Sequence, residues 1–437
     1  MGGRLPAWGC RPHPVDPVIL SEFGSAAAFA VFPSLAEEPM PAKVVHIITR
    51  MILGGAQENT LLTCEGLLRS GPWDVTLVTG PAIGPEGELI ERALRNGVPT
   101  IIVPELRRAV NPWRDAASAA KLVSIVRGLR PAIVHTHSSK AGILGRLAAR
   151  AARVPVIVHT IHGLPFYDYQ GRVAHEAFAL SERVAARCCD RLVCVADAMA
   201  QKALAAGVGR PELYVTVYSG MEVEAFLNAG SSRGAVRREF GFREGDIVIG
   251  KIARLFDLKG HKYVLEAARE ILSRCPRARF LFVGDGILRD RLQKQAARLG
   301  VADRVVFAGL IDASHIPAMI SAMDIVVHAS LREGLARVLV QALLCAKPVV
   351  SYDVDGACEV IADGRTGRLV PPESVRELAE AVLDLIERPD HAAQMAREGR
   401  RRVRDAFRAE TMVGRLERIY RELLSAKGLP GPTETAF

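Results

Sequence analysis

Short runs of β-branched and apolar residues alternate with amphipathic segments along most of this 437-residue chain. The first set includes KVVHIIT, WDVTLVT, PTIIVP, AIVHTH, VIVHTIH and RLVCVA. Alternating strands and helices form βαβ units, in which a parallel sheet carries helices on both faces. The strands are apolar throughout, as expected for a sheet that is buried on both sides. The pattern therefore predicts an α/β fold with doubly wound parallel sheets.

A segment rich in Gly, Ser and charge, residues 228–246, interrupts the alternation, which resumes with IVIGKIA, ARFLFVG, RVVFAG, DIVVHA and KPVVSY. We therefore expect two Rossmann-like domains that face each other, over residues 40–225 and 226–407. Ligands of such sheets bind beyond the carboxyl ends of the strands, so the predicted site is the cleft between the domains. Residues 408–428 are predicted to be helical, and 429–437 to form a tail.

The first 39 residues differ from the rest of the chain. They are rich in Gly and Pro and show neither a helical nor a strand period. A signal peptide is one interpretation, but no clean cleavage site accompanies the short apolar piece SAAAFAVF. We expect Met40 to be the native start, and residues 1–39 to be a disordered leader or the product of a mis-assigned gene start.

Composition narrows the class of partner. The formal net charge is +9, which suits phosphorylated substrates, anionic lipid or nucleic acid. The basic residues form no dense block along the sequence and no nucleic-acid-binding motif is present, so nucleic acid is not an expected partner. Eight cysteines without CxxC spacing indicate reduced cytosolic thiols rather than disulfides or a zinc site.

No apolar run in the sequence approaches the roughly 20 residues needed to cross a bilayer. We expect a cytoplasmic protein, with peripheral contact to the inner membrane leaflet favoured by its positive charge. The basic amphipathic stretch RVAHEAFALSERVAARCCDRL, residues 172–192, is the candidate for that contact. A helix packed on its own domain is the alternative interpretation of the same pattern.

Glycines and cations follow several predicted strands. Gly54 and Gly55 come after the first strand, where backbone N–H groups at a helix start can approach a phosphate; a plain tight turn is the alternative. The segment is not GxGxxG, so no nicotinamide fingerprint is present. In the second half, Arg254 and Lys259 bracket a strand-to-helix loop and are suited to gripping a diphosphate. Lys259 at a helix start opposes the helix dipole, which an anionic ligand would explain.

Other strand ends in the second half suit a nucleotide base. Gly284 and Asp285 follow one strand, and residues 307–310, with Phe307, Gly309 and Leu310, follow the next. Asp353 and Asp355 imitate a DxD metal motif, but no further ligands stand nearby in the sequence. We therefore expect no metal there.

Histidines end two strands of the first half. His135 and His137 precede Ser138, Ser139 and Lys140, and His159 and His162 lie on and after the next strand. A metal site is disfavoured because the sequence offers no carboxylate or cysteine partners nearby. His135 and His159 fit core positions, whereas His137 and His162 are expected to be polar residues of the cleft.

Taken together, the glycine pair, Arg-x4-Lys-Gly, GDG and the REGL at residues 332–335 resemble the retaining glycosyltransferases of family 4, which have the GT-B fold. The resemblance runs from about Val44 to Ile361, and the family's closing helices follow. SSKAG and IHGLPF further resemble bacterial members that build surface polysaccharide or other envelope glycans. The resemblance implies transfer of a sugar from a nucleotide-diphosphate sugar to a hydroxyl, with no metal and no other cofactor. It also implies that the last helix, residues 408–428, crosses back onto the first domain.

The resemblance and the strand-end motifs together give a set of candidate site residues. Arg254 and Lys259 are expected to hold the diphosphate, Glu333 to face the sugar, and His162 to lie near the reacting centre. The expected donor-binding residues are Gly54, Gly55, Arg254, Lys259, Gly284, Asp285, Phe307, Gly309, Leu310, Glu333, Gly334, Leu335 and Gln341. His137, Ser138, Ser139 and Lys140 are acceptor-side candidates. The expected acceptor is a glycan or a lipid-linked sugar.

The chain departs from the family pattern at three places. Gln341 stands where the family has a second Glu, Ala336 where Pro is frequent, and Cys358 where Pro is common. Eight residues of a helix that begins at Glu333 turn through about 800°, so we expect Gln341 to stay near the Glu333 side and face the cleft. The resemblance places the ribose hydroxyls there, so the amide implies a neutral ribose contact. Two alternatives stay open: a nucleotide-sugar 2-epimerase of the same fold, and a non-catalytic nucleotide-sugar-binding partner.

Overall fold

The computed structural model describes residues 41–83, 88–167 and 169–432. The expected leader at residues 1–39 and the end of the expected tail, 433–437, lie outside these ranges. No helix within them is long and apolar enough to cross a membrane.

The first half of the described chain is a seven-stranded parallel sheet in the order β3-β2-β1-β4-β5-β6-β7. Its strands are β1 Ala42–Ile48, β2 Trp73–Thr79, β3 Thr100–Ile102, β4 Ile133–His137, β5 Val156–Ile161, β6 Arg191–Cys194 and β7 Tyr214–Thr216. The helices between them are α1 Gly55–Ser70, α2 Ile90–Arg95, α3 Pro112–Leu129, α4 Ser139–Ala151, α5 Arg172–Ala186 and α6 Asp197–Ala205. The central strands β1, β2, β4 and β5 are buried along most of their length, which explains why they read as continuous apolar runs, whereas the edge strands β3 and β7 are partly exposed.

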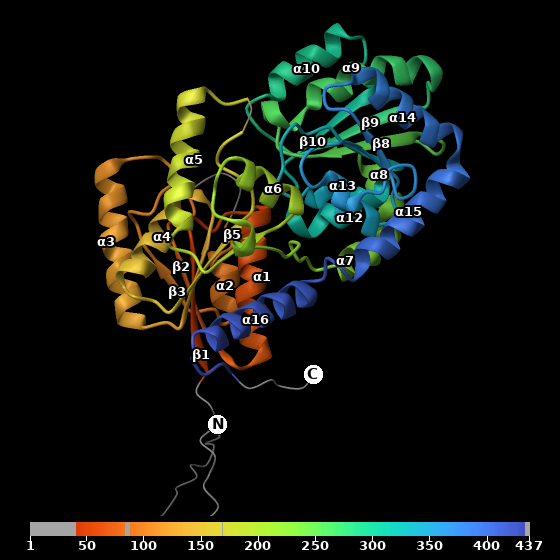
Figure 1. The fold of residues 1–437 in the computed structure, drawn as a ribbon. Helices are drawn as coiled ribbons and strands as arrows, with labels where there is room; N and C mark the ends of the chain where they lie inside the picture. The colour runs from red at the N-terminus through yellow and green to blue at the C-terminus, as the bar shows by residue number, and fades with distance from the viewer. Residues whose placement is uncertain (1–40, 84–87, 168, 433–437) are drawn as a thin grey trace, which may run out of the picture. The chain divides into compact units, whose positions relative to one another are not determined.

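The second half is a six-stranded parallel sheet in the order β10-β9-β8-β11-β12-β13. Its strands are β8 Ile247–Ile252, β9 Ala278–Val283, β10 Val305–Gly309, β11 Ile325–His328, β12 Val349–Tyr352 and β13 Arg368–Val370. Its helices are α7 Glu224–Leu227, α8 Arg233–Glu239, α9 His261–Arg274, α10 Arg289–Arg298, α11 Ile316–Ala322, α12 Arg337–Leu344, α13 Ala357–Val360, α14 Val375–Glu387 and α15 Pro389–Arg404. Figure 1 shows both sheets with helices on either face, so two Rossmann-like doubly wound domains are present as predicted.

The last helix, α16 Ala409–Ala426, packs on the first half of the chain (Figure 1). Its apolar side chains, among them Met412 and Leu416, share a core cluster with α1, β1 and β2. The approach to α1 is close, because a Cβ at Gly66 would lie 2.4 Å from a methyl of Val413. The helix therefore ties the end of the chain to its first domain.

One apolar cluster joins the two halves. Val195, Ala196 and Met199 of the first half belong to the same buried cluster as Leu335 and Leu339 of the second. The carboxyl ends of the two sheets are thus held against each other, and the loops that leave those ends define the site.

Candidate functional site

A cavity of about 410 Å³ lies between the two halves of the described chain. It is lined by the loops after β1, β8 and β11, together with residues that follow β5, β6 and β7. In each sheet the strand order reverses between β1 and β4 or between β8 and β11, and ligands of doubly wound sheets bind at such switch points. The cavity therefore lies where the fold predicts a ligand.

Two helices begin at this cavity. The start of α1, at Gly54 and Gly55, lines one side, and the start of α12, from Ala336 to Val338, lines another. The structure shows no side-chain cap at either start within the described residues. Uncapped N–H groups and the positive end of the helix dipole both favour an anion. A Cβ at Gly55 would lie 2.8 Å from the Arg337 Cδ, so a larger residue there would displace the Arg337 side chain.

Lys259 and Glu333 form an ion pair in the cavity wall. The Lys259 Nζ donates to the Glu333 Oε1 at 2.5 Å, and His328 Nε2 lies 3.3 Å from the same oxygen. Burial would raise the pKa of Glu333, but the Lys259 ammonium and the His328 hydrogen bond outweigh it and hold that pKa well below its usual range. Glu333 is therefore an anion with a fixed position. Gly260, which follows Lys259, has a φ of 66° and supplies the left-handed turn that leads into α9.

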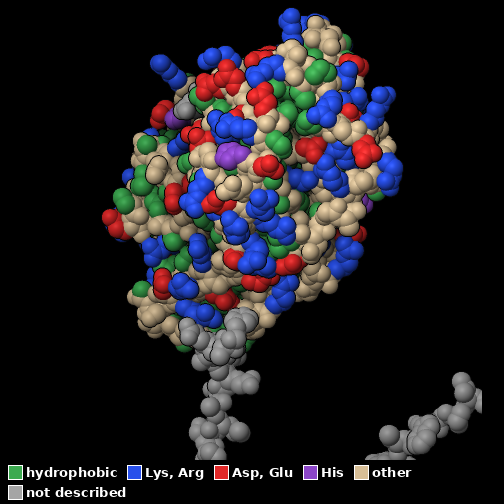
Figure 2. Space-filling model, turned by 90° about the vertical axis from the view of Figure 1, so that its right-hand side faces the viewer, with side chains coloured by type: hydrophobic (Ala, Val, Ile, Leu, Met, Phe, Trp, Pro, Cys, Tyr) green, Lys and Arg blue, Asp and Glu red, His purple; other side chains and the backbone are tan. Residues whose placement is uncertain are grey.

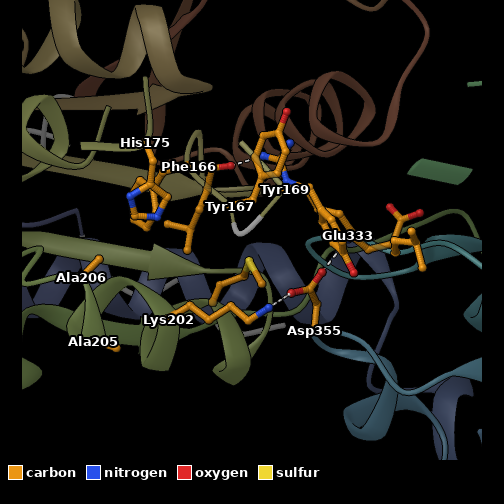
Figure 3. A pocket seen from close by; sticks show the side chains of 13 residues that line it. Phe166, Tyr167, Tyr169, His175, Lys202, Ala205, Ala206, Glu333 and Asp355 are labelled. Carbon is orange, nitrogen blue, oxygen red and sulfur yellow. Dashed lines mark hydrogen bonds and ion pairs between the residues drawn. The ribbon is translucent and has the colours of Figure 1, made fainter. Parts of the chain in front are cut away.

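Asp355 holds the backbone of the same loop. Its Oδ2 accepts a hydrogen bond from the Glu333 N–H at 2.6 Å, and its other oxygen pairs with Lys202 of α6 (Figure 3). The DxD-like pair noted in the sequence thus supplies a carboxylate that positions Glu333 and joins the two halves.

Arg337 is a site residue that the sequence reasoning missed. It lines the cavity, and its Nη2 donates to Glu58 of α1 at 2.7 Å across the cleft. The signal was present, because Arg337 is the first residue of α12 and opposes the helix dipole just as Lys259 does. Together with Arg50, Arg254 and Lys259 it makes four cations around the cavity, against one carboxylate, Glu333, among the described lining residues.

Helix α12 starts later than the sequence suggested. Glu333 to Ala336 are not helical, and the helix begins at Arg337. The expectation that Glu333 opens the helix is therefore wrong, and so is the eight-residue helical arc drawn from it to Gln341. Gln341 lies one turn beyond Arg337, half-buried, and is not among the residues that line the cavity. By contrast, Gly334 and Leu335 do line it.

The candidates for the base lie beside the cavity rather than in its wall. Gly284 and Asp285 follow β9, and the Gly284 N–H donates to the Gly309 carbonyl of β10 at 2.8 Å. Phe307 is half-buried against Phe282, whereas Leu310 is 64 % exposed. The Leu255 N–H donates to the Asp285 carbonyl, so these strand ends adjoin the Arg254 loop.

The histidine motifs of the first half separate in the structure. His162 lines the cavity, as expected for a cleft residue. His137 is only 1 % exposed, which contradicts the expectation that it faces the cleft. Both His135 and His159 are also buried, as core positions should be.

Three acceptor-side candidates remain: Ser138, Ser139 and Lys140. None of them lines this cavity or the smaller cavity on the other side of Glu333. The Ser138 Oγ lies 2.7 Å from the Thr49 Oγ1, and Ser139 starts α4. Lys140 forms an ion pair with Asp115, with its Nζ 2.7 Å from a carboxylate oxygen. These contacts assign the segment to holding β1, α3 and α4 together.

A second cavity, of about 310 Å³, lies on the other side of Glu333. Figure 3 shows Phe166, Tyr167, Tyr169 and His175 of the first half around it, with Glu333 and Asp355 opposite. The Arg332 guanidinium lies 4.0 Å from the centre of the Tyr167 ring. Glu333 lines both cavities. It therefore stands between the first, which we call the cationic cavity, and the second, the aromatic cavity.

Comparisons with known proteins agree with this geometry. Residues 232–402 match the family described as Glycosyl transferases group 1, and residues 54–220 match the Glycosyl transferase 4-like domain. Two facing parallel-sheet domains with a cleft between them constitute the GT-B fold. The chain belongs to the group 1 glycosyltransferases, in family 4.

Relatives and solved structures cover most of the chain. An Escherichia coli UDP-Gal:alpha-D-GlcNAc-diphosphoundecaprenol alpha-1,3-galactosyltransferase is 25 % identical over 389 residues, 88 % of this chain and 98 % of that protein. The 2-deoxystreptamine glucosyltransferase of Streptomyces kanamyceticus is 28 % identical, over 67 % of this chain and 78 % of its own. The crystal structure of Anabaena HepE with UDP is similar in fold, with a TM-score of 0.74, 24 % identity and coverage of 88 % of this chain and all of that one.

Proposed function

We propose that this protein is a retaining hexosyltransferase that moves a sugar from a nucleotide-diphosphate sugar to a hydroxyl of a lipid-linked or cell-envelope glycan. The observation that carries the proposal is the cationic cavity with two uncapped helix starts. Arg254, Lys259 and Arg337 line it together with the starts of α1 and α12. Such a site suits a diphosphate that gains charge as its bond to the sugar breaks.

The nucleotide of the donor is proposed from the comparisons. HepE is known in complexes with UDP and with UDP-glucose, and the E. coli relative is named for UDP-Gal. These names support a uridine donor for the present chain. The cations take the place that a metal would hold beside the diphosphate, so we propose metal-independent transfer with no cofactor besides the sugar nucleotide.

Retention is proposed to proceed on one face of the sugar. The bond from the anomeric carbon to the phosphate oxygen breaks, the acceptor oxygen bonds to the same face, and its proton passes to the leaving phosphate. Glu333 is the one carboxylate among the described residues of the cationic cavity, and Lys259 and His328 hold it in place. It therefore orients the donor sugar rather than attacking it.

The aromatic cavity is proposed to receive the acceptor. Aromatic rings offer flat apolar faces to sugar rings, and Tyr167 and Tyr169 stand across from Glu333, where the donor sugar would lie. His175, which also lines this cavity, belongs to α5. That helix exposes Val173, Leu180 and Val184, which are 87 %, 58 % and 45 % exposed and share one face at helical spacing.

An exposed apolar stripe beside an acceptor pocket suits a lipid-linked substrate. We therefore propose that α5 contacts the inner leaflet of the membrane from the cytoplasmic side. Lys and Arg side chains elsewhere are spread among Asp and Glu over the face seen in Figure 2. That mixture does not favour nucleic acid as a partner.

One assay tests the function. The protein is incubated with UDP, GDP and ADP sugars, with and without a polyprenyl-diphosphate-linked sugar, and products are identified by mass spectrometry and anomeric NMR. Acceptor-dependent transfer with retained configuration is expected. Conversion of donor alone would instead indicate an epimerase, and donor binding by calorimetry without turnover a non-catalytic partner.

The membrane contact has its own test. L180E is expected to weaken flotation with anionic vesicles and to slow transfer to the lipid-linked acceptor, while a short water-soluble acceptor analogue is used at the wild-type rate. E176Q, on the same helix, is the matched control. Equal losses on both acceptors would contradict a membrane role for the stripe.

A further inference from the structure

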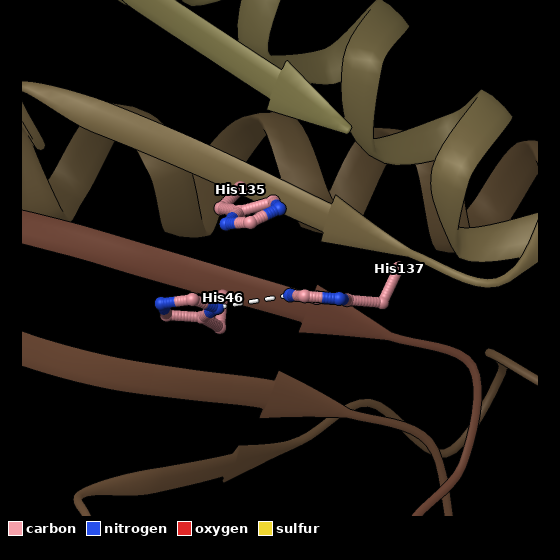
Figure 4. A group of neighbouring side chains, drawn as sticks. All are labelled: His46, His135 and His137. Carbon is pink, nitrogen blue, oxygen red and sulfur yellow. Dashed lines mark hydrogen bonds between the residues drawn. The ribbon is translucent and has the colours of Figure 1, made fainter. Parts of the chain in front are cut away.

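Three histidine rings lie together beneath the cleft. His46 of β1 stands opposite His135 of β4 in the strand register, and His137 is two residues further along β4. Figure 4 shows the three rings close together beside β1 and β4. They are 0 %, 0 % and 1 % exposed, and all three have a pKa lowered by burial, so the rings are neutral.

Hydrogen bonds connect two of these rings to the cationic cavity. His46 Nδ1 lies 2.9 Å from His137 Nε2, and His137 Nδ1 lies 3.1 Å from His162 Nε2. Since His162 lines the cavity, three imidazoles form a continuous chain from the core to the site. Both nitrogens of the middle ring, His137, are used in it.

A metal ion is the competing explanation for this cluster, because ligand atoms of His46, His135 and His137 lie within 4.8 Å of one another. However, His135 has partners at both nitrogens: the Tyr420 hydroxyl at 2.5 Å and the Thr160 hydroxyl at 2.7 Å. With both His137 nitrogens also bonded, hydrogen bonding accounts for two of the three rings. The hydrogen-bonded chain is thus the better account of the cluster.

When the imidazoles of His46, His137 and His162 are all neutral, their protons can be arranged in only two ways that keep both hydrogen bonds. If each ring carries its proton on Nε2, His46 keeps a buried N–H, and its Nε2 has no partner among the described residues. If each ring carries its proton on Nδ1, that buried nitrogen is bare, and the last N–H, on His162, faces the cavity. Buried N–H groups without an acceptor are rare, so the second arrangement is favoured.

We propose that His46 and His137 are positioning residues that hold His162 as its Nδ1–H tautomer, so that it donates a hydrogen bond to an oxygen of the bound sugar nucleotide. This inference rests on the proposed function for the identity of the ligand. His46 donates to His137, which donates to His162, and His162 donates into the cavity. Of the three hydrogen-bonded histidines, His162 is the one that contacts the substrate.

Amide substitutions at His46 test in which direction the three histidines donate their hydrogen bonds. The Asn amide nitrogen reaches the place of Nδ1 and can donate to His137, whereas the Gln amide lies nearer to Nε2. H46N is expected to keep most of kcat, and H46Q to lose about 10- to 100-fold with an unchanged donor KM, because misplacement of a substrate-contacting group slows the chemical step. Circular dichroism and Tm establish that both variants fold. An equal kcat in the two variants, or the reverse order, would overturn the proposal.

A second measurement does not depend on turnover. Two-bond ¹H–¹⁵N correlations on the ¹⁵N-histidine-labelled protein report each tautomer, with signals assigned by their loss in H46N, H137F and H162A. His46, His137 and His162 should all carry the proton on Nδ1. An Nε2–H tautomer at His162, or a stoichiometric metal that H46N releases, would overturn the proposal. A wild-type protein without transferase activity would refute the proposed function, and the tautomers would still decide this inference.

Discussion

At the scale of single residues, Lys259 has the clearest role. Its ammonium meets Glu333 at 2.5 Å in the wall of a cavity built for an anion. K259A should lower kcat by about 100- to 1000-fold, because a preorganised charge at the leaving group is lost. Steady-state transfer kinetics measure the effect, and calorimetry with UDP measures the accompanying loss of affinity.

Two further variants accompany K259A. K259R keeps a cation and is expected to recover part of the rate, and E333Q should abolish transfer while leaving UDP affinity nearly unchanged. All three should unfold at temperatures near that of the wild type, since the pair lies at the cavity rather than in a core. A fully active K259A enzyme would refute the diphosphate assignment.

Gln341 is a residue whose role the sequence alone could not decide. Its half-buried place one turn into α12 is outside the cavity wall, yet on the helix whose start faces the donor. Q341E is expected to leave the donor KM nearly unchanged, because the side chain at this position lies outside the cavity wall. Donor titrations with UDP-sugar measure the change. A KM lowered several-fold would instead show that position 341 contacts the ribose, since a carboxylate accepts hydrogen bonds from hydroxyls more strongly than an amide.

The functional role of a charged residue was predictable from the sequence where its charge opposed the dipole of the helix that it begins. Lys259 stood out as a cation at a helix start, and the same conflict marks Arg337, which went unnoticed. The helix start at Arg337 was not predictable, because the apolar sequence LARVLVQALL is continuous through it. The histidine chain was also out of reach, since His46 and His137 are 91 residues apart and meet only through the register of β1 and β4.

At the scale of elements, α16 depends on one buried carboxylate. Glu417 accepts from the Trp73 Nε1 at 2.8 Å and from the Ser70 hydroxyl at 2.5 Å, and it is 5 % exposed. E417A should lower the free energy of unfolding by about 1–3 kcal/mol, because buried donors lose their acceptor. Urea unfolding followed by Trp fluorescence measures it.

E417Q is the matched control, since both donors bond to the same Glu417 oxygen and an amide oxygen in that place can still accept from them. It should be less destabilising than E417A. Equal destabilisation by both variants would mean that packing, rather than the hydrogen bonds, joins α16 to β2. Helices and strands of this length and periodicity were predictable from sequence, whereas the surface that α16 covers needed the family resemblance.

At the scale of the whole molecule, buried histidines make the fold sensitive to acid. Six described histidines are buried: His46, His135, His137, His159, His261 and His328. Burial is the largest cause that lowers the pKa of each, to about 3 for His46 and about 2 for His261. The unfolded chain binds protons at these residues below a pH of about 6.5, and the folded chain does not. Folding is therefore favoured above that pH and loses free energy as the pH falls toward 3.

Each fully buried histidine contributes at most about 1.4 kcal/mol per pH unit to this slope. The free energy of unfolding should fall steeply between pH 6.5 and 5, a window above the range in which carboxylates titrate. H261F is the control, because both nitrogens of His261 are buried without a partner among the described residues and its ring already packs against Phe282. That variant should show a slope smaller by up to one proton and no loss of stability at pH 7. Urea titrations at four pH values measure both quantities, and a slope that H261F leaves unchanged would show that His261 is protonated in the folded protein.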